Sequence, residues 1–166
     1  MNSNTVNTLN QYLTFTLNKE LFALDISWVK EILSNVCITK VPRMPKYILG
    51  VINVRGHAIP VVDLHAKFET GKSNISSETC VIIIEVEMAD EVVVIGALAD
   101  TVQEVIELKD DQINPPPKIG TSIDTKFLKG FGKKDEGFII ILDTNCVFAD
   151  EEIETIKATT NCKENN

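Results

Sequence analysis

The sequence lacks the features that mark several large classes of protein. It has 16 basic residues against 24 acidic ones and a formal net charge of −8. It therefore has no basic excess with which to bind the phosphates of nucleic acid or an anionic membrane surface. No apolar run is long enough to span a membrane, and the first ten residues contain neither the basic nor the apolar part of a secretory signal. We expect a cytoplasmic protein with no nucleic-acid partner and no membrane insertion.

Metal ligands and nucleophiles are also scarce. The cysteines are far apart and form no Cys-x-x-Cys pair, so we expect reduced, idle thiols. The histidines are His57 and His65, and no Ser/His/Asp grouping or Gly-x-Ser-x-Gly elbow stands out. Residues 130–134 resemble a phosphate loop but lack the upstream glycine and the Ser or Thr after lysine, which favours a solvated loop. We predict a protein that is not an enzyme and uses no metal or other cofactor.

Short apolar runs between turn residues are what the sequence has in abundance. Residues 12–17 alternate polar and apolar side chains, as in a half-buried strand. Residues 79–86 and 91–98 are almost continuously apolar, as in strands covered on both faces. The predicted strands are 10–17, 21–26, 36–40, 50–54, 58–62, 79–86, 91–98, 101–108 and 137–142. Many short strands without long alternating helices indicate a mainly all-β fold.

Few segments favour a helix. Ser27 is a plausible N-cap for a short helix over Trp28–Leu33. Its apolar residues do not fit one stripe, so one of them is a candidate for contacting a partner. Single helical turns are predicted over 65–68 and 125–129, and Asp63 is expected to cap a turn through backbone amides. The acidic start and apolar spacing of 150–158 predict a C-terminal helix.

Two polar segments interrupt the strands. Residues 69–78 contain glycine and three serines, which is typical of a linker. We predict that this segment lies near the junction of two subdomains. Residues 109–118 contain three successive prolines, which have no N–H to donate, so regular structure is not expected there.

Residues 41–64, VPRMPKYILGVINVRGHAIPVVDL, are the most distinctive stretch. They predict a strand, a tight turn at Arg55-Gly56, and a second strand, with Gly56 able to adopt a positive φ. This hairpin would hold Arg55 rigidly at its tip. Two interpretations of Arg55 remain open: a surface arginine that pairs with a local carboxylate such as Glu31, or an interface anchor whose planar guanidinium needs little ordering to bind.

This stretch resembles the signature block of the CheW-type coupling proteins of bacterial chemotaxis. The matching residues, at fixed spacing, are Pro45, Tyr47, Ile48, Gly50, Val51, Asn53, Arg55, Gly56, Pro60, Val61, Asp63 and Leu64. Weaker matches outside it include Asp25-Ile26, Glu31-Ile32, Gly96, Asp100 and Val102. The resemblance extends from about residue 11 to about residue 156.

The resemblance implies two small five-stranded SH3-like β-barrels packed together, within one CheW-like domain over residues 10–158. Residues 1–9 and 159–166 would then be flexible tails. The implied function is a non-enzymatic adaptor that couples chemoreceptor tips to the CheA histidine kinase, which has its own CheW-like domain. An alternative is a CheW-like domain excised from a larger kinase or from a CheV-type protein. The implied partner-binding residues are Val29, Glu31, Ile32, Asn53, Arg55, Gly56 and Gly96.

Overall fold

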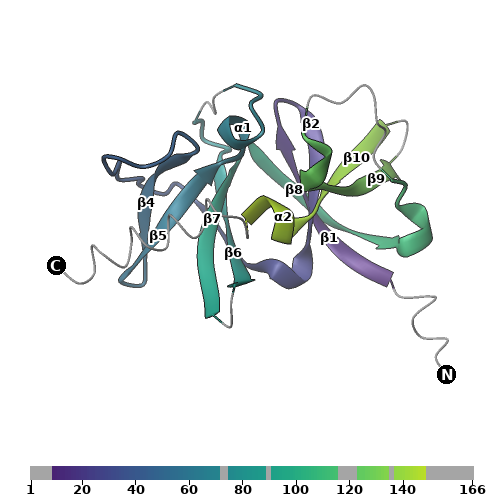
Figure 1. Ribbon diagram of the computed structural model, residues 1–166, viewed down its shortest axis with the longest axis horizontal. Helices are drawn as coiled ribbons and strands as arrows, with labels where there is room; N and C mark the ends of the chain where they lie inside the picture. The colour runs from purple at the N-terminus through teal and green to yellow at the C-terminus, as the bar shows by residue number, and fades with distance from the viewer. Residues whose placement is uncertain (1–8, 72–74, 89–90, 116–122, 135–136, 149–166) are drawn as a thin grey trace.

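The computed structural model describes residues 9–71, 75–88, 91–115, 123–134 and 137–148. They form two five-stranded sheets, here named sheet A and sheet B (Figure 1). Sheet A contains β1 (Leu9–Leu17), β2 (Glu20–Asp25), β8 (Thr101–Lys109), β9 (Leu128–Lys134) and β10 (Gly137–Leu142). Sheet B contains β3 (Val29–Ser34), β4 (Ile48–Val54), β5 (His57–Asp63), β6 (Cys80–Met88) and β7 (Glu91–Ala99). The helical elements are α1 (Leu64–Lys67), α2 (Thr144–Phe148) and the 3₁₀ turns η2 (Ile26–Trp28), η3 (Asp110–Gln112) and η4 (Thr125–Phe127).

The two sheets have the same kind of strand order. Sheet A is ordered β8-β1-β2-β10-β9 and sheet B is ordered β3-β6-β7-β5-β4. Each sheet has one parallel pair, β2 with β10 and β5 with β7, while the other neighbours are antiparallel. The prediction of a mainly all-β protein with two five-stranded units is confirmed. That each unit is an SH3-like barrel stays a prediction.

The chain passes between the sheets at η2, which joins β2 to β3, and at Asp100, which joins β7 to β8. Sheet B is thus built from one continuous segment that lies between two parts of sheet A. Residues 69–78 connect α1 to β6 within the sheet B segment, so they do not carry the chain between the sheets as the linker prediction implied. They do start close to sheet A, because the Asn18 side chain donates to the Thr70 carbonyl oxygen at 3.3 Å.

A polar network ties the two halves together near this point. His65 in α1 is 1% exposed, and its Nε2 lies 3.1 and 3.2 Å from the carboxylate oxygens of Asp100. The same carboxylate accepts from the backbone N–H of Asn18 in the β1–β2 turn at 2.8 Å. Asp100 lies where the chain passes from β7 of sheet B to β8 of sheet A. Its carboxylate therefore contacts both α1, which follows β5 of sheet B, and the β1–β2 turn of sheet A.

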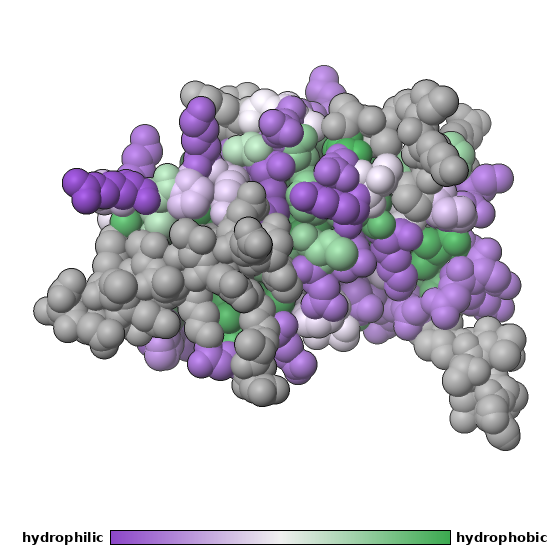
Figure 2. Space-filling model, viewed as in Figure 1, coloured by the Kyte–Doolittle hydropathy of each residue, from purple (hydrophilic) through white to green (hydrophobic). Residues whose placement is uncertain are grey.

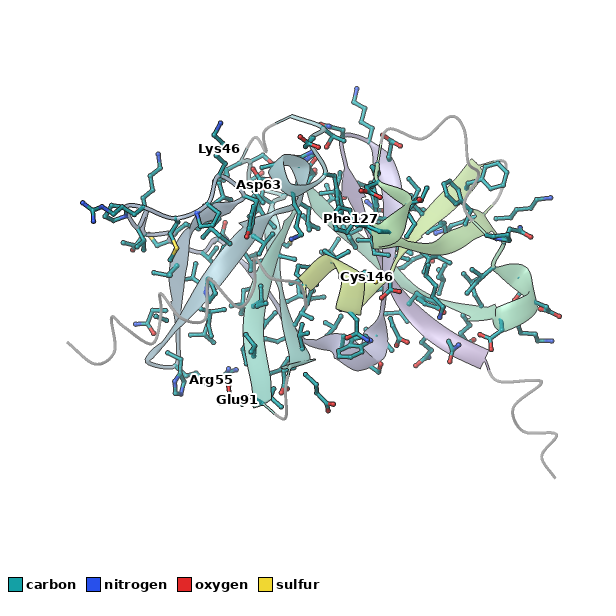
Figure 3. All side chains as sticks on the ribbon, in the orientation of Figure 1. Lys46, Arg55, Asp63, Glu91, Phe127 and Cys146 are labelled. Carbon is teal, nitrogen blue, oxygen red and sulfur yellow. The ribbon has the colours of Figure 1, made fainter. Side chains whose placement is uncertain are left out.

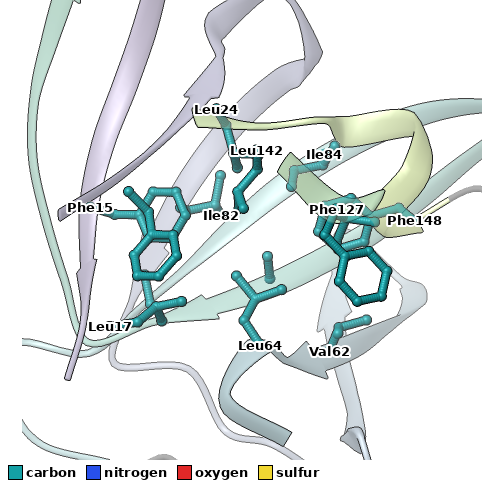
Figure 4. Packing of buried hydrophobic residues seen from close by; sticks show 14 of the residues in the cluster. Phe15, Leu17, Leu24, Val62, Leu64, Ile82, Ile84, Phe127, Leu142 and Phe148 are labelled. Atoms are coloured by element: carbon teal, nitrogen blue, oxygen red, sulfur yellow. The ribbon is translucent and has the colours of Figure 1, made fainter. Parts of the chain in front are cut away.

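The largest apolar cluster lies between the sheets and draws residues from both (Figure 4). Phe15, Leu17 and Leu24 come from sheet A, whereas Ile82 and Ile84 come from sheet B. A second cluster covers the other face of sheet B, and a third covers the other face of sheet A. The two halves therefore share one core and each adds a smaller core of its own.

Strand β6 shows why its sequence is almost continuously apolar. Ile82 and Ile84 belong to the shared core, while Val81 and Ile83 belong to the second cluster of sheet B. Since successive side chains of a strand point to opposite faces, a strand covered on both faces has no polar position in its middle. The prediction of a doubly covered strand is confirmed.

The predicted helix over Trp28–Leu33 is wrong. The segment forms the last residue of η2 and then strand β3. Asp25, not Ser27, is the N-cap, because its Oδ1 accepts from the backbone N–H of Ser27 at 2.9 Å. Strand β3 pairs with β6 from Val29 to Ser34, with a register shift between Val29 and Glu31. Tertiary pairing therefore decides the conformation of a run that is too short to be a stable helix.

Several shorter predictions also need correction. Residues 36–40 form no strand but a single bridge from Thr39 to Val51. Residues 130–134 are part of strand β9, not a solvated loop. The turn predicted at 125–129 ends at Phe127, and residues 110–112 form a 3₁₀ turn within the stretch expected to lack regular structure. The predicted helix at 150–158 lies outside the described residues.

In both sheets, a glycine in the edge strand of a hairpin allows an earlier segment of the chain to approach closely. In β4, Gly50 has a φ of +155°, and a Cβ there would lie 2.1 Å from the Thr39 carbonyl oxygen. In β9, a Cβ on Gly130 would lie 2.4 Å from the Asn114 carbonyl oxygen. Each glycine thus lets an earlier segment bridge to the edge strand, through Thr39 with Val51 and Asn114 with Phe131.

Candidate functional site

The tip of the β4–β5 hairpin is built to hold one conformation. Arg55 and Gly56 form a two-residue turn with φ values of +50° and +87°. Positive φ at both positions matches the twist of the flanking strands, and glycine adopts it without strain. The Asn53 side-chain oxygen accepts from the backbone N–H of Gly56 at 2.8 Å. Asn53 and Gly56, two of the predicted site residues, therefore fix the backbone from which Arg55 extends.

Arg55 pairs with Glu31 of β3 in a bidentate contact. Its Nη1 donates to Glu31 Oε2 at 2.6 Å, and its Nη2 donates to Glu31 Oε1 at 3.1 Å. The contact joins the β4–β5 turn to β3, and β4 and β3 are the two edge strands of sheet B. Figure 3 shows Arg55 at the tip of this hairpin. The local pairing that the sequence left as an alternative is present.

Pairing does not hide Arg55 from a partner. The Arg55 side chain is 70% exposed, whereas that of Glu31 is 23% exposed. The hydrogen bond from Arg55 lowers the pKa of the Glu31 carboxyl below its ordinary value of 4.5 and in turn raises the pKa of Arg55. At neutral pH the tip therefore carries an ordered ion pair whose guanidinium faces solvent.

The predicted residues of β3 lie on two faces of that strand. Glu31 is opposite Ile83 of β6, on the face of the second cluster of sheet B. Val29 and Ile32 are opposite Ile84 and Ile82, on the face of the shared core. Val29 packs against that core, but Ile32 is 42% exposed. Since β3 is an edge strand, both faces meet solvent along the same border of sheet B.

Gly96 does not join this surface. It is buried in β7 between Val61 of β5 and Ile83 of β6. A Cβ at this position would lie 2.6 Å from Cγ1 of Val81. The absence of a side chain at Gly96 thus serves close packing within sheet B.

A recess beside β3 was missed by the sequence analysis. Its lining residues are Ser27, Trp28, Glu85, Glu87 and Val92, around a volume of about 340 Å³. In the sequence, Trp28 falls within the predicted helix that the structure replaces with a 3₁₀ turn and a strand. The lining residues come from η2, β6 and β7, so the recess depends on tertiary packing that a single sequence does not give.

The other reactive side chains singled out in the sequence occupy ordinary structural positions. Asp63 accepts from the backbone N–H of His65 at 3.0 Å, which confirms that it caps α1. His57 is an exposed residue at the start of β5. Cys37 and Cys80 are free thiols. Within the described ranges, no three His, Cys, Asp or Glu side chains are grouped as a metal ion would require. Nor does any helix there have the length and apolar character needed to cross a membrane.

The face of the molecule in Figure 2 is mostly hydrophilic, with hydrophobic side chains visible in small separate patches. Such patches are normal for a protein surface and do not by themselves mark a binding site. The Arg55–Glu31 pair is distinguished by its ordered bidentate geometry.

Comparisons with known proteins agree with this architecture. The family model described as CheW-like domain matches residues 11–152. The chain is 31% identical over 146 residues to the chemotaxis protein CheW of Klebsiella aerogenes, covering 88% of this chain and 86% of that protein. It is 29% identical over 151 residues to the chemotaxis protein CheW of Bacillus subtilis, covering 90% and 94%.

A solved structure is also similar. The crystal structure of the scaffolding protein TtCheW from Thermoanaerobacter tengcongensis superposes with a TM-score of 0.76 at 38% sequence identity. The match covers 87% of this chain and 91% of that one. Sequence block, fold and relatives lead to one conclusion: this chain belongs to the CheW family.

Proposed function

We propose that the protein is an adaptor in chemotaxis signal transduction that couples the cytoplasmic tips of chemoreceptors to a CheA-type histidine kinase. It would act in the cytoplasm, beside membrane receptor arrays, and by binding rather than catalysis. Membership in the CheW family and the likeness to a scaffolding protein support this role. The relatives are named as chemotaxis protein CheW and as a scaffolding protein, and these names support the adaptor over the alternative of a domain excised from a larger kinase or CheV-type protein.

The observation that carries the proposal is the ordered, exposed ion pair at the hairpin tip. Arg55 is fixed by the turn that Asn53 caps and by its bidentate contact with Glu31. Binding an already ordered side chain costs less conformational entropy than binding a mobile one. Arginine is also enriched among residues that dominate protein interfaces. We infer that this tip, with Val29 and Ile32 of β3, forms a partner-binding surface.

Direct titration tests the proposal. Purified protein is titrated by calorimetry against the regulatory, CheW-like domain of a CheA kinase and, separately, against a chemoreceptor hairpin fragment. Saturable binding to both is expected, and a ternary complex should elute as one species in size-exclusion chromatography. Absence of binding to both partners at concentrations up to about 1 mM, which corresponds to about −4 kcal/mol, would contradict the adaptor role.

A further inference from the structure

We propose that His65 makes the junction between the two sheets sensitive to pH, because protonation of its imidazole strengthens the hydrogen bond to Asp100. The inference stands on the buried geometry around His65 and does not depend on the proposed function. His65 is 1% exposed in α1, which follows β5 of sheet B. Figure 1 shows α1 beside the β1–β2 turn of sheet A, where the Asn18 side chain reaches the Thr70 carbonyl oxygen.

One ring nitrogen of His65 faces a carboxylate. Its Nε2 lies 3.1 Å from Oδ1 and 3.2 Å from Oδ2 of Asp100. A carboxylate only accepts hydrogen bonds, so Nε2 carries a hydrogen whether the ring is neutral or charged. When the ring is also protonated at Nδ1, the same contact joins two opposite charges, and Coulomb attraction is added to the hydrogen bond.

The other ring nitrogen faces a hydroxyl that can serve either protonation state. Thr70 Oγ1 lies 3.5 Å from Nδ1 of His65, near the outer limit of a hydrogen bond, and 3.3 Å from the His65 carbonyl oxygen. When the hydroxyl donates to that carbonyl, its oxygen is left to accept from a protonated Nδ1. Both nitrogens of the charged ring then have an acceptor, which reduces the cost of burying the charge.

The charged groups in contact with His65 are acidic. Asp100 faces the ring, and Asp63, the N-cap of α1, accepts from the backbone N–H of His65 at 3.0 Å. Lys67 of the same helix is directed to two aromatic rings, of which the nearer has its centroid 4.7 Å from Nζ. The charged residues of the adjoining turn and of the segment after α1 are exposed: Lys19, Glu20 and Glu69. A positive charge on the imidazole is therefore attracted by its nearest charged neighbours.

The expected pH dependence has a definite sign. Histidine ordinarily changes its charge between about pH 5 and pH 8. The added attraction between His65 and Asp100 exists only while the imidazole is protonated, so it is present at the acidic end of this range and is lost as the pH rises. Mild acidification should thus tighten the junction between the sheets, as long as the Asp100 carboxylate stays ionised.

Urea denaturation of the whole chain at several pH values tests the inference. The wild type is compared with His65→Gln, which keeps an N–H donor for Asp100 but does not titrate. The unfolding constant of His65→Gln divided by that of the wild type measures what the imidazole contributes. This ratio should be at least about fivefold larger at about pH 5.5 than at about pH 8.5.

His57→Gln is the matched control, because His57 is the other histidine of the chain and is exposed at the start of β5. Its ratio should change by less than about twofold over the same pH range. Asp100→Asn keeps an acceptor but removes the charge, so it should be destabilised most at acidic pH, and it decides the test if His65→Gln does not fold. A ratio for His65→Gln that is independent of pH, or an equal change in His57→Gln, would overturn the inference.

Discussion

The guanidinium of Arg55 combines two properties that usually exclude each other. It is ordered by two hydrogen bonds to Glu31, and it remains largely exposed. An exposed ion pair of this kind contributes little to folding, because water and salt screen it. Its geometry therefore matters more for recognition than for stability.

Reversal of the charge at Arg55 tests this distinction. Arg55→Glu removes a bidentate donor and places a second carboxylate beside Glu31. Affinity for at least one partner, the CheA regulatory domain or the receptor fragment, should fall by about thirtyfold. The melting temperature should change by no more than about 2 °C. Calorimetric titration and thermal melts measure both. Unchanged affinity for both partners in a folded variant would show that Arg55 is an ordinary surface charge.

The swapped pair, Glu31→Arg with Arg55→Glu, adds a second comparison. Because the two side chains touch, the effects of the single changes on affinity for the partner should not be additive. The double variant should recover part of the loss in affinity, since the ion pair can re-form with reversed polarity. Additive effects would show that the contact is not maintained in solution.

The titration of Glu31 supplies a test at lower pH. Its pKa is lowered in the folded state by the hydrogen bond from Arg55. The stabilisation from this pair is therefore present above the ordinary pKa and is lost as the pH falls through the lowered value. In Arg55→Ala, the pKa of Glu31 should return towards 4.5, as measured by carboxyl carbon NMR. A titration curve identical to that of the wild type would contradict the pairing.

Single residues also show where sequence reasoning succeeded. The tight turn at Arg55-Gly56 has a local signature, so both its place and the positive φ of Gly56 were predictable. The pairing with Glu31 could only be an alternative, because it depends on which strands form the edges of sheet B. The burial of Gly96 agrees with the prediction that the strand over 91–98 is covered on both faces.

At the scale of elements, strand β3 shows how packing overrides local preference. A possible N-cap and mixed apolar residues favoured a helix, but β6 offers a complete set of backbone partners beside it. By contrast, β6, β7 and β10 begin and end within two residues of their predicted bounds. Their long apolar runs favour a buried strand over any other conformation. The segment before β4 was predicted as a strand and forms one bridge instead, because Gly50 lets it approach β4 at one point.

The close approach at Gly50 predicts a costly substitution. In Gly50→Ala the new Cβ would meet the Thr39 carbonyl, and the positive φ would be strained. The free energy of unfolding should fall by about 2 kcal/mol or more, as measured by urea denaturation.

Gly137→Ala provides the matched control in another strand. A Cβ there would come no closer than 3.9 Å to the Lys134 carbonyl oxygen. Its effect should stay within about 0.5 kcal/mol. A small effect at Gly50 would mean that the Thr39 segment can move away from β4 at little cost.

At the scale of the whole molecule, the shared core makes the two sheets one cooperative unit. A row of aromatic rings runs through it: the ring of Phe22 in β2 lies 5.9 Å from that of Phe15 and 6.2 Å from that of Phe68, and Phe68 lies 5.5 Å from Phe127. Phe68 follows α1, whereas Phe127 ends η4. These contacts join sequence segments of both halves across the interface.

Truncation of this row tests the cooperativity. Phe22→Ala, in sheet A, and Phe68→Ala, in the sheet B segment, should each lower the free energy of unfolding by about 3–5 kcal/mol. Each should weaken the protection of backbone amides from hydrogen exchange in both sheets. The reason is that residues of both sheets form the shared core, so its disruption exposes one face of each sheet. Hydrogen exchange read separately at β7 and β9 measures this. Loss of protection in only the mutated half would show that the sheets unfold independently.

The way the chain enters and leaves sheet B has a consequence for synthesis on the ribosome. All strands of sheet B lie within residues 29–99, so this sheet can complete its pairing as soon as that segment has emerged. Sheet A must wait, because β1 and β2 need β8, β9 and β10, which follow residue 100. During that interval the nascent chain presents Ile82, Ile84 and their neighbours to water without the aromatic residues that later cover them. A translational pause after residues 29–99 have emerged, but before β8, β9 and β10 have done so, would therefore prolong the most aggregation-prone state of this protein.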